Sequence, residues 1–218
     1  MKSLDKLYFE TVSSTLKEIL ELLMDKKELD RFSLVGGTSL SLQLGHRMST
    51  DIDLFSDAEY GTLDFIAIEA MLYKCFSHVE PSSVDMVSLG KHYFVGNAIS
   101  DLIKLDLYYT DAFVFDASIK NSIRLADIRD IAAMKLEAIS NGGRKKDFWD
   151  LHELMNHYSI QEMIAFHERR YPYGHNRESI IQSLMSCSNA DHDFDPICLK
   201  SKHWELIKLD IIETCERI

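Results

Sequence analysis

The pattern of apolar and polar residues is clearest between residues 32 and 55, where it predicts a strand, a short helix and a second strand. Residues 32–35 form an apolar run typical of a buried strand, which the glycine pair 36–37 ends. A short helix fits the residues that follow, with the Thr38 hydroxyl as its N-terminal cap and Gly45 at its end. Residues 49–55 then alternate polar and apolar side chains, as a half-buried strand does.

Helical and extended patterns cover most of the remaining chain. Residues 4–29 place apolar side chains near helical spacing with charges between them, so we expect one long amphipathic helix there. Strand patterns occupy residues 82–89, 92–98 and 101–109. Helical patterns occupy residues 63–76, 123–141, the segment starting at Arg144, 160–186 with an interruption at 171–174, and 201–217. The change from strands to helices predicts a boundary near residue 120, which divides the chain into units 1–120 and 121–218.

Two carboxylates share one face of the predicted strand at 49–55. Alternation places Asp51 and Asp53 on the same side, roughly 7 Å apart, with Ile52 and Leu54 opposite. Carboxylates this close repel each other unless a cation lies between them. Hard oxygen ligands suit Mg²⁺, which typically takes one or two carboxylates and completes its shell with water and substrate phosphate. The strand therefore predicts a magnesium site.

The turn before the short helix offers groups that bind anions. Gly36, Gly37, Thr38 and Ser39 present unhindered backbone amides, hydroxyls and a helix N-terminus. Because this turn directly precedes the strand of the two carboxylates, we expect a phosphate site and a metal site to converge.

A third carboxylate lies on the predicted strand at 101–109. Polar and apolar side chains alternate along it, which places Asp106 on the same face as Lys104. An ordinary exposed aspartate would show the same pattern, and Asp101 and Asp111 are nearby alternatives.

Composition places the chain among globular proteins. Of its 218 residues 46% are hydrophobic and 27% are charged, which is enough apolar material for one or two domains. No apolar run approaches the length of about eighteen residues that a membrane span needs, and the N-terminus lacks a signal-peptide core, so we expect a cytoplasmic protein without membrane contact. The four cysteines are widely spaced, which favours free thiols over disulfides or a zinc site.

A net charge of −11 argues against broad affinity for nucleic acid, because such binding depends on Lys and Arg displacing counterions from phosphates. An RNA substrate would need a local basic patch, for which residues 144–146 and the pair Arg169-Arg170 are the dense candidates. A solvated helix face is the simpler explanation of Arg169-Arg170.

Two other features invite a metal interpretation that their pattern does not support. The acidic segment 189–196, NADHDFDP, lacks the ligand and glycine pattern of an EF-hand, so we expect a solvated loop. His46 is expected to fix the turn before the D-x-D strand rather than to coordinate metal.

The string GGTSLSLQLGHRMSTDIDLF, with Arg47 inside it, resembles the AbiEii-like nucleotidyltransferases, which are known chiefly as toxins of bacterial toxin–antitoxin systems. A glycine pair, a short helix and D-x-D on the following strand resemble the signature of the wider polymerase-β-like nucleotidyltransferase superfamily. ADIRDIAAMKLEAI followed by R-x-K-D-x-x-D-L is similar to the second block of the AbiEii-like signature. The two blocks lie in the expected order between Leu34 and Leu151.

This resemblance implies an α/β (α+β) fold, in which a nucleotidyltransferase core with a small mixed sheet is followed by a helical C-terminal domain that completes a cleft. It implies that Asp51, Asp53 and Asp106 hold two Mg²⁺ ions, and that Lys135 binds phosphates. Asp147 would act as an auxiliary acid or base or hold a basic neighbour, although helix capping also explains it. The implied nucleotide-binding residues are Gly36, Gly37, Thr38, Ser39, Arg47, Lys135, Arg144 and Lys146. Asp150 would help to frame the far side of the cleft.

The implied reaction is Mg²⁺-dependent transfer of a nucleotide from a nucleoside triphosphate to an acceptor hydroxyl, with release of pyrophosphate. In some toxins of this type the acceptor is a tRNA 3′ end, and a cognate antitoxin would be the partner. Two alternatives stay open: an enzyme that modifies a protein or a small molecule such as an antibiotic, and a non-catalytic nucleotide-binding interaction module. The intact D-x-D counts against the module, because a chain freed from catalysis has no reason to keep repelling carboxylates together.

Overall fold

The computed structural model describes residues 6–81 and 89–218, and a mixed sheet of seven strands forms the centre of one half of this part of the chain. Along the sheet the order is β3-β4-β5-β2-β1-β7-β6. The pairs β2 with β5 and β1 with β7 are parallel, and the other pairs are antiparallel. The bounds are β1 Ser33–Leu34, β2 Asp51–Ser56, β3 His78–Pro81, β4 Gly90–Gly96, β5 Ile103–Tyr109, β6 Ser118–Lys120 and β7 Ile123–Leu125. The predicted α/β fold class is confirmed.

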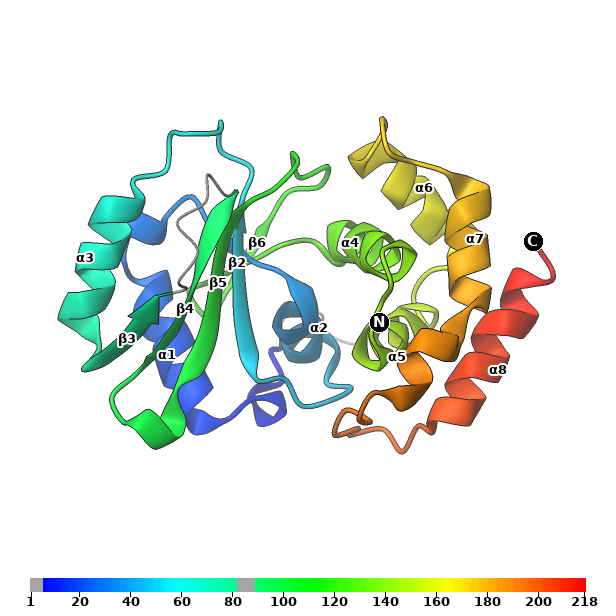
Figure 1. The fold of residues 1–218 in the computed structure, drawn as a ribbon, viewed down its shortest axis with the longest axis horizontal. Coiled ribbons are helices and arrows are strands. Elements are labelled where there is room, and N and C mark those ends of the chain that lie inside the picture. Colours follow the sequence, from blue (N-terminus) through cyan, green and yellow to red (C-terminus); the bar gives the residue numbers. More distant parts are fainter. Residues whose placement is uncertain (1–5, 82–88) are drawn as a thin grey trace.

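Helices lie beside the sheet in one half of the molecule and form the other half by themselves (Figure 1). Helices α1 and α3 accompany the sheet, whereas α4 to α8 pack together beyond α2. The bounds are α1 Ser14–Met24, α2 Gly36–Leu44, α3 Phe65–Cys75, α4 Ile128–Ser140, α5 Lys145–Leu154, α6 Ile160–Arg170, α7 Arg177–Met185 and α8 Trp204–Cys215. Short 3-10 turns lie at Phe9–Thr11, Lys27–Leu29, Ile99–Asp101 and Cys187–His192.

Helix α2 joins the two halves because it is buried on opposite sides. Leu42 belongs to the hydrophobic cluster of the sheet, α1 and α3. Leu40 and Leu44, four residues apart on the other side of the helix, belong to the cluster formed with α4 to α8. The glycine turn that begins α2 is therefore held between the sheet and the helical half.

The N-terminal segment differs from the single long helix expected for residues 4–29. It contains a 3-10 turn, then α1 alone as a regular helix, and then a second 3-10 turn. Ser13 interrupts the pattern because its hydroxyl accepts a hydrogen bond from the Leu16 amide at 3.1 Å and caps α1. Apolar spacing alone did not reveal this cap.

Most other predicted elements are present at close to the expected positions. The predicted helix over 160–186 is split by residues 171–174 as expected, into α6 and α7. The predicted strand over residues 82–89 falls almost entirely outside the described residues. Strands β3, β6 and β7 were not predicted, and β7 replaces the beginning of the helix expected over residues 123–141. The sheet therefore extends to Leu125, and the helical half begins with α4 at Ile128. Within the described residues, no helix combines the length and apolar character that crossing a bilayer requires.

Candidate active site

Two of the three predicted metal carboxylates lie side by side on neighbouring parallel strands. The register of β2 and β5 pairs Asp53 with Asp106 and Asp51 with Lys104. Asp106 accepts a hydrogen bond through Oδ2 from Lys104 Nζ at 2.5 Å, while its buried Oδ1 has no hydrogen-bond partner among the described residues. Asp51 lies at the beginning of β2, where its Oδ2 is 3.4 Å from Nζ of Lys146 on α5. Both strands and one helix of the other half thus contribute to this carboxylate cluster.

The charged form of Asp53 is disfavoured at this position. Burial, followed by repulsion from Asp106, raises the pKa of the Asp53 carboxyl to about 6. A Cβ atom at Gly36 would collide with Asp53 Oδ2, and Gly36 also has a φ of +67°. Glycine is therefore required at position 36 both for the backbone conformation and for the close approach of the carboxylate.

The donor chemistry of this cluster fits a divalent cation. Among residues 6–81 and 89–218, no group of three or more histidine, cysteine, aspartate or glutamate side chains is gathered closely enough to hold a metal ion. Lys104 and Lys146 instead place their ammonium groups on Asp106 and Asp51. The unpartnered Oδ1 of Asp106 and the repulsion at Asp53 are features that a hard cation would relieve.

The glycine turn has a different geometry from the one expected at Thr38. Helix α2 begins at Gly36, with Val35 as its N-cap residue and without a capping side chain. Thr38 is buried inside the first turn, where its hydroxyl donates to the Asp51 carbonyl and lies 2.8 Å from Ser49 Oγ. The predicted role of Thr38 as the helix cap is wrong, because this hydroxyl instead ties α2 to the start of β2.

Gly37 has a separate steric role. A Cβ atom at this position would collide with Nη2 of Arg47, so the absence of a side chain lets the guanidinium lie against the helix start. The free amides at the beginning of α2 retain the positive end of the helix dipole beside Asp53. The two glycines therefore lie between the Asp53 carboxylate and the Arg47 guanidinium.

Arg47 belongs to a buried ionic network centred on Asp150. The Asp150 side chain is fully buried and accepts from Arg47 Nε at 2.6 Å and from Arg47 Nη2 at 2.8 Å. Its other contacts are His46 Nε2 at 2.8 Å and Lys135 Nζ at 2.7 Å. Lys135 also binds Asp147 Oδ1 at 2.7 Å. Two cations and two carboxylates thus balance in charge and connect α4, α5 and the turn between α2 and β2.

The pKa directions agree with this geometry. Burial opposes the charge on Asp150, but Arg47 and Lys135 outweigh it and hold the pKa of the Asp150 carboxyl well below its usual range. Burial likewise opposes the charge on Asp147, yet Lys135 lowers the pKa of that carboxyl. Burial lowers the pKa of His46 despite its contact with Asp150, which favours the neutral form of the ring.

Two of the residues predicted for the nucleotide site, Lys135 and Asp147, are part of this network. Lys135 is buried, and its ammonium is held by two carboxylates rather than presented to solvent. Asp147 holds this basic neighbour and also caps α5, since its Oδ2 accepts from the Arg144 amide at 3.0 Å. Asp150, whose position sequence reasoning described only as the far side of the cleft, is the centre of the network.

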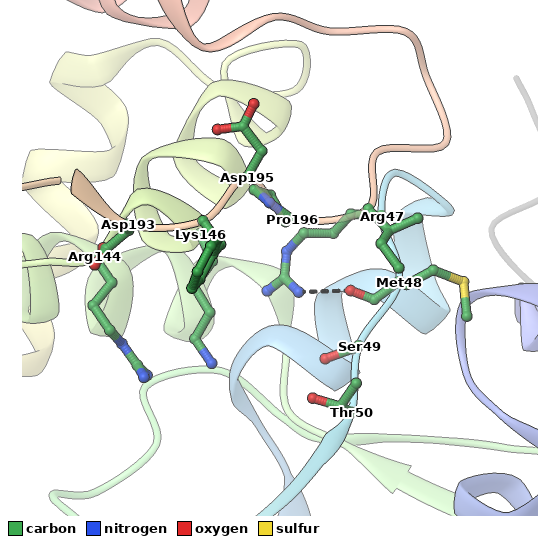
Figure 2. Close-up of a pocket in the computed structure, with 11 residues that line it drawn as sticks. Arg47, Met48, Ser49, Thr50, Arg144, Lys146, Asp193, Asp195 and Pro196 are labelled. Atoms are coloured by element: carbon green, nitrogen blue, oxygen red, sulfur yellow. Dashed lines mark hydrogen bonds between the residues drawn. The ribbon is translucent and has the colours of Figure 1, made fainter. Parts of the chain in front are cut away.

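A cavity of about 360 Å³ opens between the start of β2 and the beginning of α5. Figure 2 shows Arg144 and Lys146 extending from α5 into the space that Ser49 and Thr50 face. The cavity is lined by Arg47, Met48, Ser49, Thr50, Arg144, Lys146, Asp193, Phe194, Asp195, Pro196 and Ile197. It therefore brings three of the predicted nucleotide-binding cations together next to Asp51.

The acidic segment is mostly exposed, as we expected, but two of its carboxylates bind the start of α5. Asp193 Oδ2 accepts from the Lys145 amide, and Asp195 Oδ1 accepts from Lys145 Nζ, both at 2.9 Å. Residues 193–197 form one wall of the cavity. The composition of the segment drew attention to it, but no local pattern indicated that it returns to α5.

The two residues of the other candidate basic patch, Arg169-Arg170, have different environments. Arg170 is buried and binds Asp130 Oδ1 at 3.0 Å, whereas Arg169 lies over the Phe115 ring with 4.7 Å between its Cζ and the ring centroid. Arg169-Arg170 is therefore not a paired phosphate-binding patch, because one member stabilises the interior.

Comparisons with known proteins agree with this geometry. An uncharacterized protein of Aquifex aeolicus (strain VF5) is 30% identical over 160 residues, which cover 71% of this chain and 73% of the relative. The structure of MenT4, a nucleotidyltransferase toxin from Mycobacterium tuberculosis H37Rv, matches with a TM-score of 0.60 at 14% identity, over 93% of this chain and 82% of that one. The structure of JHP933 from Helicobacter pylori matches with a TM-score of 0.55 at 18% identity, over 93% of this chain and 88% of that one. At these identities the two structures show a common fold.

A family model provides the assignment that the structures do not. The model described as nucleotidyl transferase AbiEii toxin, type IV toxin–antitoxin system, matches residues 18–214. The predicted resemblance and the prediction of a nucleotidyltransferase enzyme are thereby confirmed. This chain belongs to the AbiEii family of nucleotidyltransferase toxins.

Proposed function

We propose that this protein transfers a nucleotide from a nucleoside triphosphate to an acceptor hydroxyl in a Mg²⁺-dependent reaction, and that it acts in the cytoplasm as the toxin of a toxin–antitoxin pair. The observation that carries the proposal is the placement of Asp53 and Asp106 in register on parallel strands, with the glycine turn of α2 against Asp53. Phosphate-binding amides and metal-binding carboxylates are the two elements that nucleotide transfer requires.

The residues of the site have different roles in the proposed reaction. Mg²⁺ held by Asp51, Asp53 and Asp106 would neutralise the triphosphate and make the acceptor hydroxyl more acidic. The amides of residues 36–38 bind phosphate oxygens, whereas the Ser39 amide donates to the Val35 carbonyl at 3.4 Å. Lys146 adds a positive charge at the edge of the cluster. The acceptor oxygen attacks the α-phosphorus as the bond to pyrophosphate breaks. Asp106, whose Oδ1 has no hydrogen-bond partner within residues 6–81 and 89–218, takes the proton that the hydroxyl loses.

The buried network positions this machinery. Asp150 holds Arg47 against Gly37, and Asp147 and Asp150 together hold Lys135. The two cations held in this way are Arg47 and Lys135. Because their charges are compensated by carboxylates, they act as fixed supports, whereas Arg144 and Lys146 are the cations directed into the cavity.

We propose an RNA acceptor, with a tRNA 3′ end as the leading candidate, and a cognate antitoxin as partner. The paired cations Arg144 and Lys146 support this choice because they line the cavity that adjoins Asp51. The net charge of −11 favours a rival, in which the acceptor is a protein hydroxyl or a small molecule. The non-catalytic binding module would retain the cavity but perform no transfer.

The melting temperature with and without ligands tests whether the cleft binds Mg²⁺ and a nucleoside triphosphate. With Mg²⁺ and a nucleoside triphosphate each far above its dissociation constant, we expect the melting temperature to rise by about 5 °C or more, because a ligand that binds only the folded state stabilises it. The shift should be largest with both ligands present, and chelation of Mg²⁺ should remove most of it.

Paired variants make this measurement specific. Asp106→Asn should lose the shift, whereas Asp101→Asn should keep it, since Asp101 lies in an exposed 3-10 turn before β5. The absence of a shift with any of the four triphosphates would contradict the proposed cleft.

A further inference from the structure

Phe194 is an aromatic side chain whose environment does not match a structural role. It lines the cavity beside β2 and α5, yet it is 99% exposed. It belongs to neither hydrophobic cluster of the described residues. Other large apolar side chains are exposed as well, but Phe194 differs from them because it lines the same cavity as Arg144 and Lys146, where its ring is free to contact a ligand.

The backbone on both sides of Phe194 is fixed. Asp193 and Asp195 both bind Lys145, one through the amide at the start of α5 and the other through Nζ, each at 2.9 Å. The Ile197 carbonyl then accepts from the Met48 amide at 2.8 Å. The ring is therefore carried by a short segment anchored to both α5 and the turn before β2. Figure 2 shows the Asp195 carboxylate directed away from Arg144 and Lys146, which leaves these two cations uncovered by that group.

The cavity combines two kinds of recognition group. Arg144 and Lys146 flank Lys145 in the sequence, and both line the cavity together with Phe194. Cations bind phosphate, and an exposed aromatic face binds a nucleobase by stacking, without preference among the bases. A ligand that satisfies both groups at once is a nucleotide unit, because it joins a charged phosphate to a flat base.

We propose that Phe194 is a stacking platform for a nucleobase at this cavity, with Arg144 and Lys146 binding the phosphate of the same nucleotide unit. The inference rests on the proposed function and adds a base-binding residue to it. The base belongs either to the nucleoside triphosphate or to the terminal nucleotide of an RNA acceptor, and binding measurements distinguish these two sources.

The test compares Phe194→Ala with the wild-type protein by calorimetric titration in the presence of Mg²⁺. Three probes are used: a nucleoside triphosphate, inorganic tripolyphosphate, and a short single-stranded RNA that ends in CCA. We expect Phe194→Ala to weaken either the triphosphate or the RNA by about tenfold, the effect of losing one stacked base, and to leave tripolyphosphate unchanged. Weaker binding of the triphosphate would show that Phe194 stacks on the base of the nucleoside triphosphate. Weaker binding of the RNA would show that it stacks on the terminal base of the acceptor.

Two controls keep the result specific. Phe194→Tyr should retain binding because the stacking face is preserved. Tyr173→Ala removes an equally exposed aromatic, at 104%, from the turn between α6 and α7 and should change nothing. The inference would be overturned if wild type and Phe194→Ala bound all three probes with equal affinity. It would also be overturned if the variant lost as much affinity for tripolyphosphate as for the triphosphate or the RNA. Failure of the wild-type protein to bind any probe would overturn the proposed function as well.

Discussion

Replacing Asp53 with asparagine is expected to lower nucleotide transfer by about 10³-fold or more, because one charged ligand of the reacting centre is lost. The same variant should raise the melting temperature of the metal-free protein by a few degrees, corresponding to about 1 kcal/mol. Asparagine has nearly the same shape as aspartate but removes the repulsion from Asp106 that, together with burial, raises the pKa of Asp53 to about 6. A variant that loses activity and gains stability indicates that Asp53 is kept for catalysis although it lowers the stability of the fold.

The measurement pairs an activity assay with thermal unfolding in the presence of a chelator. Asp101→Asn serves as the matched control, since it removes a nearby exposed carboxylate outside the cluster and should change neither quantity. Transfer by Asp53→Asn within tenfold of wild type would remove Asp53 from the reacting centre. A large fall in stability would instead show that its role is structural.

Replacing Asp150 with asparagine should cost about 3–5 kcal/mol of unfolding free energy at pH 7, which is the typical penalty for breaking a buried ion pair. The change leaves Arg47 and Lys135 buried with only Asp147 to compensate two positive charges. Because the network connects α4 and α5 to the turn before β2, the loss affects the junction of the two halves. Urea unfolding measures it directly.

A matched control and a pH series make this prediction specific. Asp210→Asn breaks a more exposed pair with His152 and should cost less than about 1 kcal/mol. In the wild type, the lowered pKa values of Asp147 and Asp150 contribute stability above about pH 4, the usual pKa of an unfolded carboxyl. That contribution falls as the pH decreases below this value, so the difference between wild type and Asp150→Asn should narrow there. A constant difference down to pH 2 would contradict the charge network.

Local pattern predicted those parts of the site that depend on a single element. Alternation placed Asp51 and Asp53 on one face of β2, and the same rule placed Asp106 beside Lys104 on β5. Glycines at 36 and 37 predicted a tight turn before a helix, but in the structure they are the first two residues of α2. The atoms that they accommodate are Asp53 Oδ2 and Arg47 Nη2. These features follow from strand periodicity and backbone sterics, which the sequence carries locally.

Contacts between distant segments were not predictable from the same rules. Thr38 suits a helix cap by residue type, but its hydroxyl is used by β2, thirteen residues away. Asp150 is 103 residues from Arg47, so no spacing could reveal that they form the centre of the network. The segment at 193–197 reaches Lys145 in the same way. Tertiary packing decides these partners, and local propensity only permits them.

The most direct measurement of the proposed chemistry is transfer of label from each α-labelled nucleoside triphosphate to total bacterial RNA and lysate protein by the purified enzyme. With Mg²⁺ present, we predict label on RNA with one or more triphosphates, and no label after chelation. Label on protein alone would favour the rival acceptor. Absence of label from every acceptor, in a preparation whose melting temperature still responds to Mg²⁺ and triphosphate, would contradict nucleotide transfer and favour a binding module.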